Sequence, residues 1–393
     1  MESIVGLKEP ARPESTAPSL RAFLELAFRP LYLAGTAWAL IAIGIWIYAP
    51  QILTGPLQGI AWHAHEMLWG FVATIAVAFL MTAGANWTGI NPLKDGALGL
   101  ACVLWLTARV GFLAGADELF WVATTTELGF FFLAAAAMMR AVYRAKNARN
   151  YAVPWLLVGL GAADALYLLA ARGGDHALLM QRFNAGLLVM ALIALLIARR
   201  VIPFFAMRAV TGLKIPLQTR TGQVQLAACA AAVVCLLAGL QVPTAAALGL
   251  AGALSLLQVV RWKPYAVRGN PLLWILYAGY TGLGIGLLMA ACAAAGASLP
   301  PALPVHMIAM AGFSVLIIGM VTRTALGHLG RPLAADRSMR ASYVLMLVAV
   351  ALRLAALAPS AFSQLALHLS AAAWIAALAL YLWRFAPLLI RPR

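Results

Sequence analysis

A chain of 393 residues that is 64% hydrophobic and only 10% charged, with a mean hydropathy of +0.91, is not a soluble globular protein. Its formal charge of +16 does not indicate nucleic-acid binding, because the basic residues recur in short clusters between apolar runs and form no single patch or tail. The four cysteines lie inside apolar runs and indicate no disulfide framework. We therefore expect an integral protein of the lipid bilayer.

The apolar runs predict an all-α fold with twelve transmembrane helices. Residues 1–27 carry several prolines and mixed charge, and we expect a flexible cytoplasmic arm without a cleavable signal peptide. Residues 28–393 are expected to form one transmembrane domain, because each run has close to the ~20 residues that a helix needs to cross a bilayer. The runs lie at about 31–49, 61–86, 97–114, 119–139, 152–170, 177–198, 224–240, 243–260, 272–294, 303–321, 341–357 and 361–386.

The positions of lysine and arginine test this topology. If the N-terminus is cytoplasmic, nearly every basic loop residue falls on the cytoplasmic side, and only Arg172 lies in an opposite loop. Arg109, Arg182 and Arg353 remain within spans or at their edges. This asymmetry follows the positive-inside rule and predicts that both termini are cytoplasmic.

The second span begins with the most unusual stretch of the chain, Trp62-His63-Ala64-His65-Glu66-Met67. Successive helical residues are ~100° apart, so the side chains of His63 and His65 diverge by about 200° and are expected to have different partners. Imidazole commonly binds iron, copper and zinc in proteins, and a methionine sulfur suits copper. The alternative is that both histidines lie at the membrane interface and bond to backbone or lipid headgroups.

The predicted topology places five of the six histidines in the outer half of the membrane. His328 alone lies at the cytoplasmic face, 22 positions beyond His306, or ~33 Å along a continuous helix. A metal site is therefore expected near the outer surface, drawing on His63, His65 and His306. Further candidate ligands are Met67, His176 and His368.

Glu127 and Asp164 are carboxylates inside apolar runs. They are interpreted either as partners of the buried arginines in structural ion pairs or as parts of a proton path. The sequence favours neither.

Several blocks of the chain resemble signature blocks of the NnrS family. They are Trp62-His63-Ala64-His65-Glu66-Met67, Asn86-Trp87-Thr88-Gly89, Arg199-Arg200-Val201-Ile202-Pro203-Phe204-Phe205 and Thr322-Arg323-Thr324-Ala325-Leu326-Gly327-His328-Leu329-Gly330-Arg331-Pro332. Leu329 departs from the threonine expected in the last block. The resemblance implies a multi-pass protein of the bacterial inner membrane that contains haem and copper and acts in nitric oxide metabolism or in defence against nitrosative stress.

The resemblance also implies roles for particular residues. His63, His65, His306 and His328 are expected to bind haem or copper, and Arg323 and Arg331 to pair with haem propionates or to anchor the helix end. No Cys-x-x-Cys-His motif is present, so the haem is expected to be b-type and non-covalent. From its position in the helix, Glu66 is expected to point to the His63 side, in apolar surroundings, either as the proton donor for reduction of nitric oxide to nitrous oxide or as a hydrogen-bond partner of a metal-bound histidine. A quinol or a periplasmic cytochrome would supply the electrons.

A second interpretation is a twelve-helix secondary transporter for a metal or a small anion. It is disfavoured because the two halves of the chain show no clear relation and because the histidines gather on one side instead of near the midplane. Bound haem and copper in the purified protein would distinguish the two.

Overall fold

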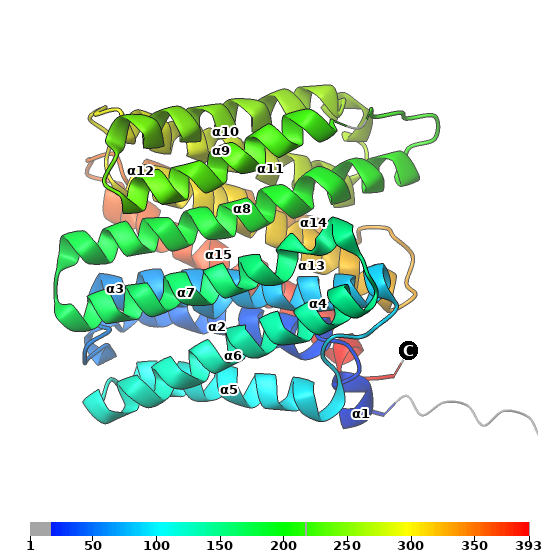
Figure 1. The fold of residues 1–393 in the computed structure, drawn as a ribbon, viewed down its shortest axis with the longest axis horizontal. Coiled ribbons are helices and arrows are strands. Elements are labelled where there is room, and N and C mark those ends of the chain that lie inside the picture. Colours follow the sequence, from blue (N-terminus) through cyan, green and yellow to red (C-terminus); the bar gives the residue numbers. More distant parts are fainter. Residues whose placement is uncertain (1–16, 217, 393) are drawn as a thin grey trace, which may run out of the picture.

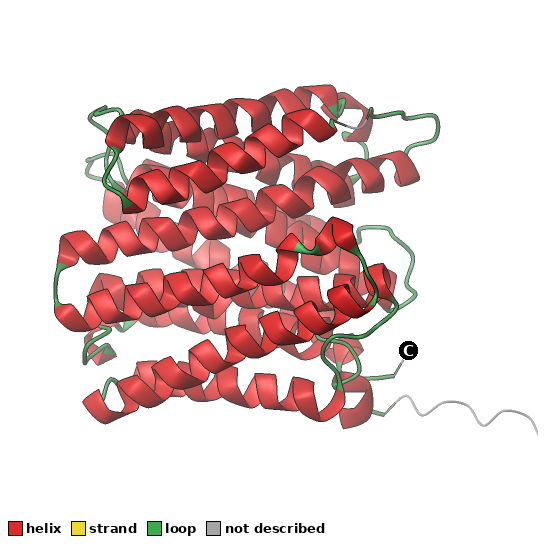
Figure 2. Ribbon diagram, in the orientation of Figure 1, coloured by secondary structure: helices red, strands yellow, loops and turns green. Residues whose placement is uncertain are grey.

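The computed structural model describes residues 17–216 and 218–392, which fold into a bundle of long helices lying side by side, with no strand in that part of the chain (Figures 1 and 2). Of the predicted arm at 1–27, residues 1–16 lie outside the described part of the chain, and the remainder contains the short helix α1. The α-helices are α1 (Leu20–Phe23), α2 (Phe28–Tyr48), α3 (Gly59–His65), α4 (Thr74–Thr88), α5 (Asp95–Ala114), α6 (Asp117–Arg144), α7 (Ala152–Gly173), α8 (His176–Ala209), α9 (Thr219–Leu237), α10 (Gln241–Arg261), α11 (Pro271–Ala294), α12 (Ala302–His306), α13 (Val315–His328), α14 (Arg337–Ala355) and α15 (Ser363–Leu389). Short 3-10 turns are η1 (Pro50–Ile52), η3 (Ala148–Asn150) and η4 (Pro264–Val267), and two π-helices are η2 (Glu66–Ala73) and η5 (Met307–Ser314).

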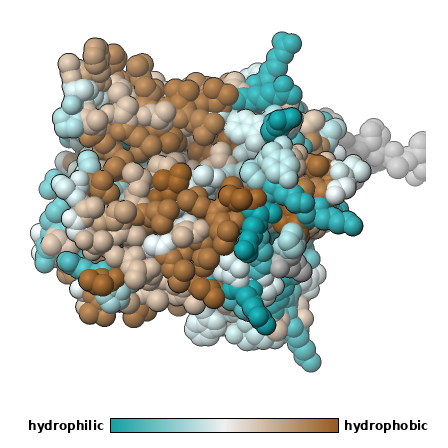
Figure 3. All heavy atoms as spheres, turned by 90° about the horizontal axis from the view of Figure 1, so that it is seen from above, coloured by the Kyte–Doolittle hydropathy of each residue, from teal (hydrophilic) through white to brown (hydrophobic). Residues whose placement is uncertain are grey.

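Twelve helical segments among the described residues are long and apolar enough to cross a membrane, which confirms the predicted number. Three of them are composite, because α3, η2 and α4 form the second span, η3 and α7 form the fifth, and α12, η5 and α13 form the tenth. A broad hydrophobic band covers the middle of the face in Figure 3, and hydrophilic side chains gather at the ends. The chain is therefore a multi-pass membrane protein.

Both ends of the described chain lie at the same face of the bundle (Figure 1). The backbone N–H of Ser19 donates to the carbonyl of Ile390 at 3.0 Å, and Arg29 Nη1 donates to the carbonyl of Leu389 at 3.1 Å. We call this the terminal face. Hydrophilic side chains are densest at this end in Figure 3. The positive-inside pattern predicts that the terminal face is cytoplasmic.

The two π-helices follow histidines directly, η2 after His65 and η5 after His306. Near the end of each, a hydroxyl side chain donates to a carbonyl five residues back, and that of Thr74 also lies 3.0 Å from the carbonyl of Gly70, four residues back. Thr74 Oγ1 lies 3.1 Å from the carbonyl of Trp69, and Ser314 Oγ lies 2.8 Å from that of Ala309. π-Helices are rare and often mark functional sites.

Glycines on α11 allow η5 to approach closely. A Cβ atom at Gly282 would lie 2.3 Å from the carbonyl oxygen of Ala311, and one at Gly279 would lie 2.7 Å from the backbone nitrogen of Leu316. Small residues of this kind let membrane helices pack backbone to backbone. This close packing of α11 against the tenth span, which we call the seam, holds the two spans side by side.

Candidate functional site

A cavity of about 520 Å³ lies between the second and tenth spans. Its walls come from α2, α3, η2, α8, α12, η5, α14 and α15, toward the end of the bundle opposite the terminal face. Most lining side chains are aliphatic or aromatic. The polar ones and the sulfur-bearing ones are His63, Met67, His176, Met180, Asn184, His306, Met310, Ser314, Arg353 and Ser370. A large apolar cavity with few polar groups is typical of a cofactor or small-molecule site.

His63 enters this cavity from the last turn of α3. Its ring stacks on Trp46 of α2, with centroids 4.9 Å apart and planes 11° apart. Its Nδ1 atom is buried and has no hydrogen-bond partner among the described residues. A buried ring nitrogen without a partner in the chain is available to bind a metal ion or another ligand.

His306 faces the same cavity from α12, and its tautomer is set by the backbone. Its Nδ1 atom donates to the carbonyl oxygen of Ala302 at 2.8 Å, because a carbonyl only accepts. The other ring nitrogen, Nε2, is then left with a lone pair. A histidine held in this way is prepared to bind a metal ion.

A methionine follows each of these histidines by four residues, Met67 after His63 and Met310 after His306, and both line the cavity. Arg353 of α14 also lines it, and its positive charge acts on both imidazoles. The cavity thus combines two imidazoles, two thioethers and one guanidinium group in an apolar surrounding.

The other predicted ligands divide into two groups. His176 at the start of α8 lines the cavity. His368 is exposed and lies against Tyr48, with ring centroids 5.6 Å apart, while His328 lies against Phe28 near the terminal face at 5.3 Å. The structure therefore brings His63, His176 and His306 together and leaves His328 and His368 away from them.

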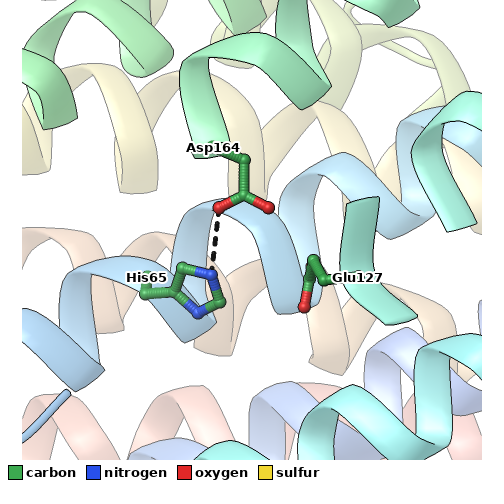
Figure 4. Close-up of side chains that lie close together, drawn as sticks. All are labelled: His65, Glu127 and Asp164. Atoms are coloured by element: carbon green, nitrogen blue, oxygen red, sulfur yellow. Dashed lines mark hydrogen bonds and ion pairs between the residues drawn. The ribbon is translucent and has the colours of Figure 1, made fainter. Parts of the chain in front are cut away.

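His65 faces away from the cavity into a buried group of charges. Its Nδ1 atom lies 2.9 Å from Glu66 Oε1, and its Nε2 atom lies 3.1 Å from Asp164 Oδ1 (Figure 4). Arg109 Nη1 donates to Glu66 Oε2 at 2.5 Å, and Arg109 also forms an ion pair with Glu127. We call these five residues the charge cluster. All of them are at most 1% exposed.

The divergence of His63 and His65 was predicted correctly, but two related expectations are wrong. His65 does not join His63 and His306, because both of its ring nitrogens face carboxylates. Glu66 does not lie in apolar surroundings on the His63 side, because Trp38 and Arg109 donate to its Oε2 atom. Gly70 leaves the space for this contact, since a Cβ there would lie 2.6 Å from Glu66 Oε2.

Arg323 and Arg331 lie near the terminal face. The guanidinium of Arg323 is over the ring of Phe205, 4.1 Å from its centroid, and Arg331 is exposed. Neither lines the cavity.

Sequence reasoning missed Met310 and considered Arg353 only as a partner of Glu127 or Asp164 in an ion pair. Met310 could have been identified from a repeated spacing, because His-x-x-x-Met occurs at His63 to Met67 and again at His306 to Met310. An arginine inside an apolar run is the signal for Arg353, because such a charge usually faces a functional interior site.

The fold and the cavity define the class of protein. It is a multi-pass all-α membrane protein with a cavity inside the helix bundle that histidine and methionine side chains line. Within it, the family model described as NnrS protein matches residues 22–393. The chain belongs to the NnrS family, as its signature blocks predicted. A comparison with curated proteins found no match.

Proposed function

We propose that this protein binds haem and copper in the cavity between the second and tenth spans and reduces nitric oxide to nitrous oxide there, in the bacterial inner membrane. The observation that carries the proposal is the meeting of His63 and His306, from two spans that both contain π-helices, in one cavity of about 520 Å³. Family membership supports the link to nitric oxide.

The residues of the cavity fit both groups. A porphyrin requires apolar and aromatic walls, imidazole for its iron and a cation for its propionates. Trp46 and Trp374 are among the walls, and Arg353 is the cation. Copper accepts imidazole and thioether ligands, and the two His-x-x-x-Met pairs offer both. We assign His63, His176 and His306 to share the two metals, with Met67 and Met310 as sulfur ligands.

When bound, haem iron and copper supply the redox chemistry, in which two nitric oxide molecules take up two electrons and two protons to give nitrous oxide and water. The protein supplies the surroundings. Its mainly apolar walls admit a small neutral gas that dissolves in lipid, and they exclude water from the reacting molecules. Trp46 and the carbonyl of Ala302 hold the imidazoles in orientation.

The charge cluster is separate from the cavity. Within residues 17–216 and 218–392, no hydrogen bond joins one of its side chains to a side chain lining the cavity. We therefore do not retain Glu66 as a direct proton donor, and give it the role of orienting His65. Glu127 and Asp164 likewise have no direct route to the cavity.

The transporter interpretation gains nothing from this cavity. The walls of the cavity are mostly apolar. They include His176 to Leu187 from the first turns of α8, so the cavity lies away from the middle of the bundle. A hydrated ion needs polar groups near the midplane.

The test is the spectrum and metal content of the purified protein, together with nitric oxide consumption measured with a chemical reductant. We expect a Soret band and bound copper in the wild type, and loss of one or both in His63→Ala and His306→Ala. His368→Ala is the matched control, because that histidine lies outside the cavity. A folded wild type without haem and copper would overturn the proposal, and binding of nitric oxide without turnover would limit it to sequestration.

A further inference from the structure

Three helices bring possible metal ligands together in the charge cluster, at a place distinct from the cavity. His65 comes from α3, Glu127 from α6 and Asp164 from α7. One ligand atom from each lies within 4.8 Å of the other two, and all three residues are buried (Figure 4). Two metal–ligand bonds of about 2.0–2.2 Å span somewhat less than this limit, so one ion contacts all three with at most a small shift of the side chains.

The surroundings of His65 resemble those of a metal-bound histidine. Glu66 faces Nδ1 and is itself fixed by Trp38 and Arg109, so Nδ1 is the natural donor and Nε2 keeps the lone pair. A carboxylate that accepts from the outer nitrogen of a histidine is the usual partner of a metal ligand. Nε2 then faces Asp164 Oδ1 at 3.1 Å, and two acceptors at this distance repel each other unless a proton or a cation lies between them.

The charges of the cluster balance only with added protons or with a bound cation. With His65 neutral, one guanidinium, Arg109, faces three carboxylates, those of Glu66, Glu127 and Asp164. The deficit is two positive charges, in a site from which water is excluded, where an uncompensated charge is costly. One divalent cation removes the deficit.

Unpartnered oxygens mark the place of the ion independently. Asp164 Oδ2 and Glu127 Oε1 are both buried and accept no hydrogen bond from any residue that the structure describes. In Figure 4 the second oxygen of Asp164 points away from His65 on the side where Glu127 lies. Buried carboxylate oxygens without donors are unusual in native proteins, and a bound ion explains them.

We propose that His65, Glu127 and Asp164 bind one divalent transition-metal cation of the Mn²⁺, Fe²⁺ or Zn²⁺ class. One imidazole and two carboxylates suit these ions, whereas Cu(I) prefers sulfur, and no sulfur atom belongs to the cluster. The ion ties α3, α6 and α7 together. The site is additional to the cavity and does not depend on haem or copper binding there.

Binding of Mn²⁺ to chelator-treated protein tests the proposal. Elemental analysis and the paramagnetic resonance spectrum give stoichiometry and affinity, and the thermal midpoint reports stabilisation, which follows from binding to the folded state alone. We expect one Mn²⁺ per chain and a raised midpoint in the wild type. Asp164→Asn and Glu127→Gln should each weaken binding by roughly tenfold or more.

Two matched controls separate this site from the others. Glu118→Gln changes an exposed carboxylate on the same helix as Glu127, and His63→Ala changes the cavity, so both should bind Mn²⁺ as the wild type does. If Asp164→Asn does not fold, the Mn²⁺ affinities of Glu127→Gln and His65→Gln test the proposal instead. Absence of Mn²⁺ binding by the wild type, or wild-type affinity in the Asp164 and Glu127 variants, would overturn the proposal and leave a cluster neutralised by protons.

Discussion

The ring of His63 lies almost parallel to that of Trp46, 4.9 Å away between centroids, so the orientation of the imidazole is set by a neighbouring helix. A ligand held by packing before a metal arrives loses less freedom on binding than a mobile one. Trp46 thus belongs to the proposed metal site although it offers no ligand atom.

Trp46→Leu should keep both metals but bind one of them less tightly, by roughly ten- to a hundredfold, the range seen when support for a ligand is removed. Competition with a chelator of known affinity measures the change. Trp383→Leu is the control, because that tryptophan is 71% exposed on α15. Equal affinities in the two variants would show that stacking on Trp46 does not prepare His63.

Removal of Arg109 should be the most damaging single change in the charge cluster. Arg109→Gln leaves Glu66 and Glu127 without their cationic partner in a dry interior. Breaking a buried ion pair by deleting one member typically costs about 3–5 kcal/mol. Denaturant unfolding in detergent measures the loss of stability.

The control for Arg109 is a surface pair of the same chemistry. Arg172 Nη2 lies 2.5 Å from Asp117 Oδ2, with both side chains substantially exposed. Water screens the attraction in such exposed pairs, so Arg172→Gln should be close to neutral. A loss as large as that of Arg109→Gln would contradict the distinction between buried and exposed pairs drawn here.

The twelve spans were predictable because each requires only a local run of apolar residues, and the family was predictable from contiguous blocks such as the one around His63. The opposite directions of His63 and His65 followed from helical geometry. The position of Glu66 did not, because its partners Trp38 and Arg109 are 28 and 43 residues away in the chain. Hydrophobic periodicity cannot predict which distant helix supplies a cation.

The π-helices were also beyond sequence reasoning. A turn widened by one residue leaves the apolar composition of η2 and η5 unchanged, and hydroxyls such as Thr74 and Ser314 often donate to the backbone in regular helices too. Only the packing of α11 against η5 shows why the widened turn is tolerated there.

Gly282 should be sensitive to substitution because of this packing. In Gly282→Ala the new methyl group meets the carbonyl of Ala311 at 2.3 Å, so the two backbones must separate. Crowding of a packed core costs about 1–3 kcal/mol, and the cavity on the other side of η5 should bind its cofactor less tightly. Thermal unfolding and haem content are the measurements.

Gly44→Ala tests whether the effect comes from crowding. Gly44 lies within α2, and a Cβ atom there meets nothing within 4 Å. Alanine also favours a helix over glycine, so this variant should be neutral or slightly stabilised. Equal destabilisation of both variants would mean that the seam between α11 and η5 is not the cause.

Asp336 gives a prediction about acid stability at the terminal face. It caps α14, where Oδ1 accepts from Ser338 at 2.6 Å and from the backbone of Met339 at 3.0 Å, while Oδ2 accepts from Arg384 at 2.7 Å. Partial burial raises its pKa, but these three hydrogen bonds outweigh that effect, and the pKa falls from 3.8 to about 2. The folded state therefore holds the ionised form more strongly than the unfolded chain does. The resulting stability is fully present above pH ~4 and is lost as the pH falls through about 2.

Asp336→Asn keeps an oxygen for the cap and removes the titration. Its stability should therefore be lower than that of the wild type at pH 6 and should approach the wild-type value as the pH falls toward 2. Denaturant unfolding at a series of pH values gives this difference, and a difference that does not change with pH would show that Asp336 acts only as a neutral cap.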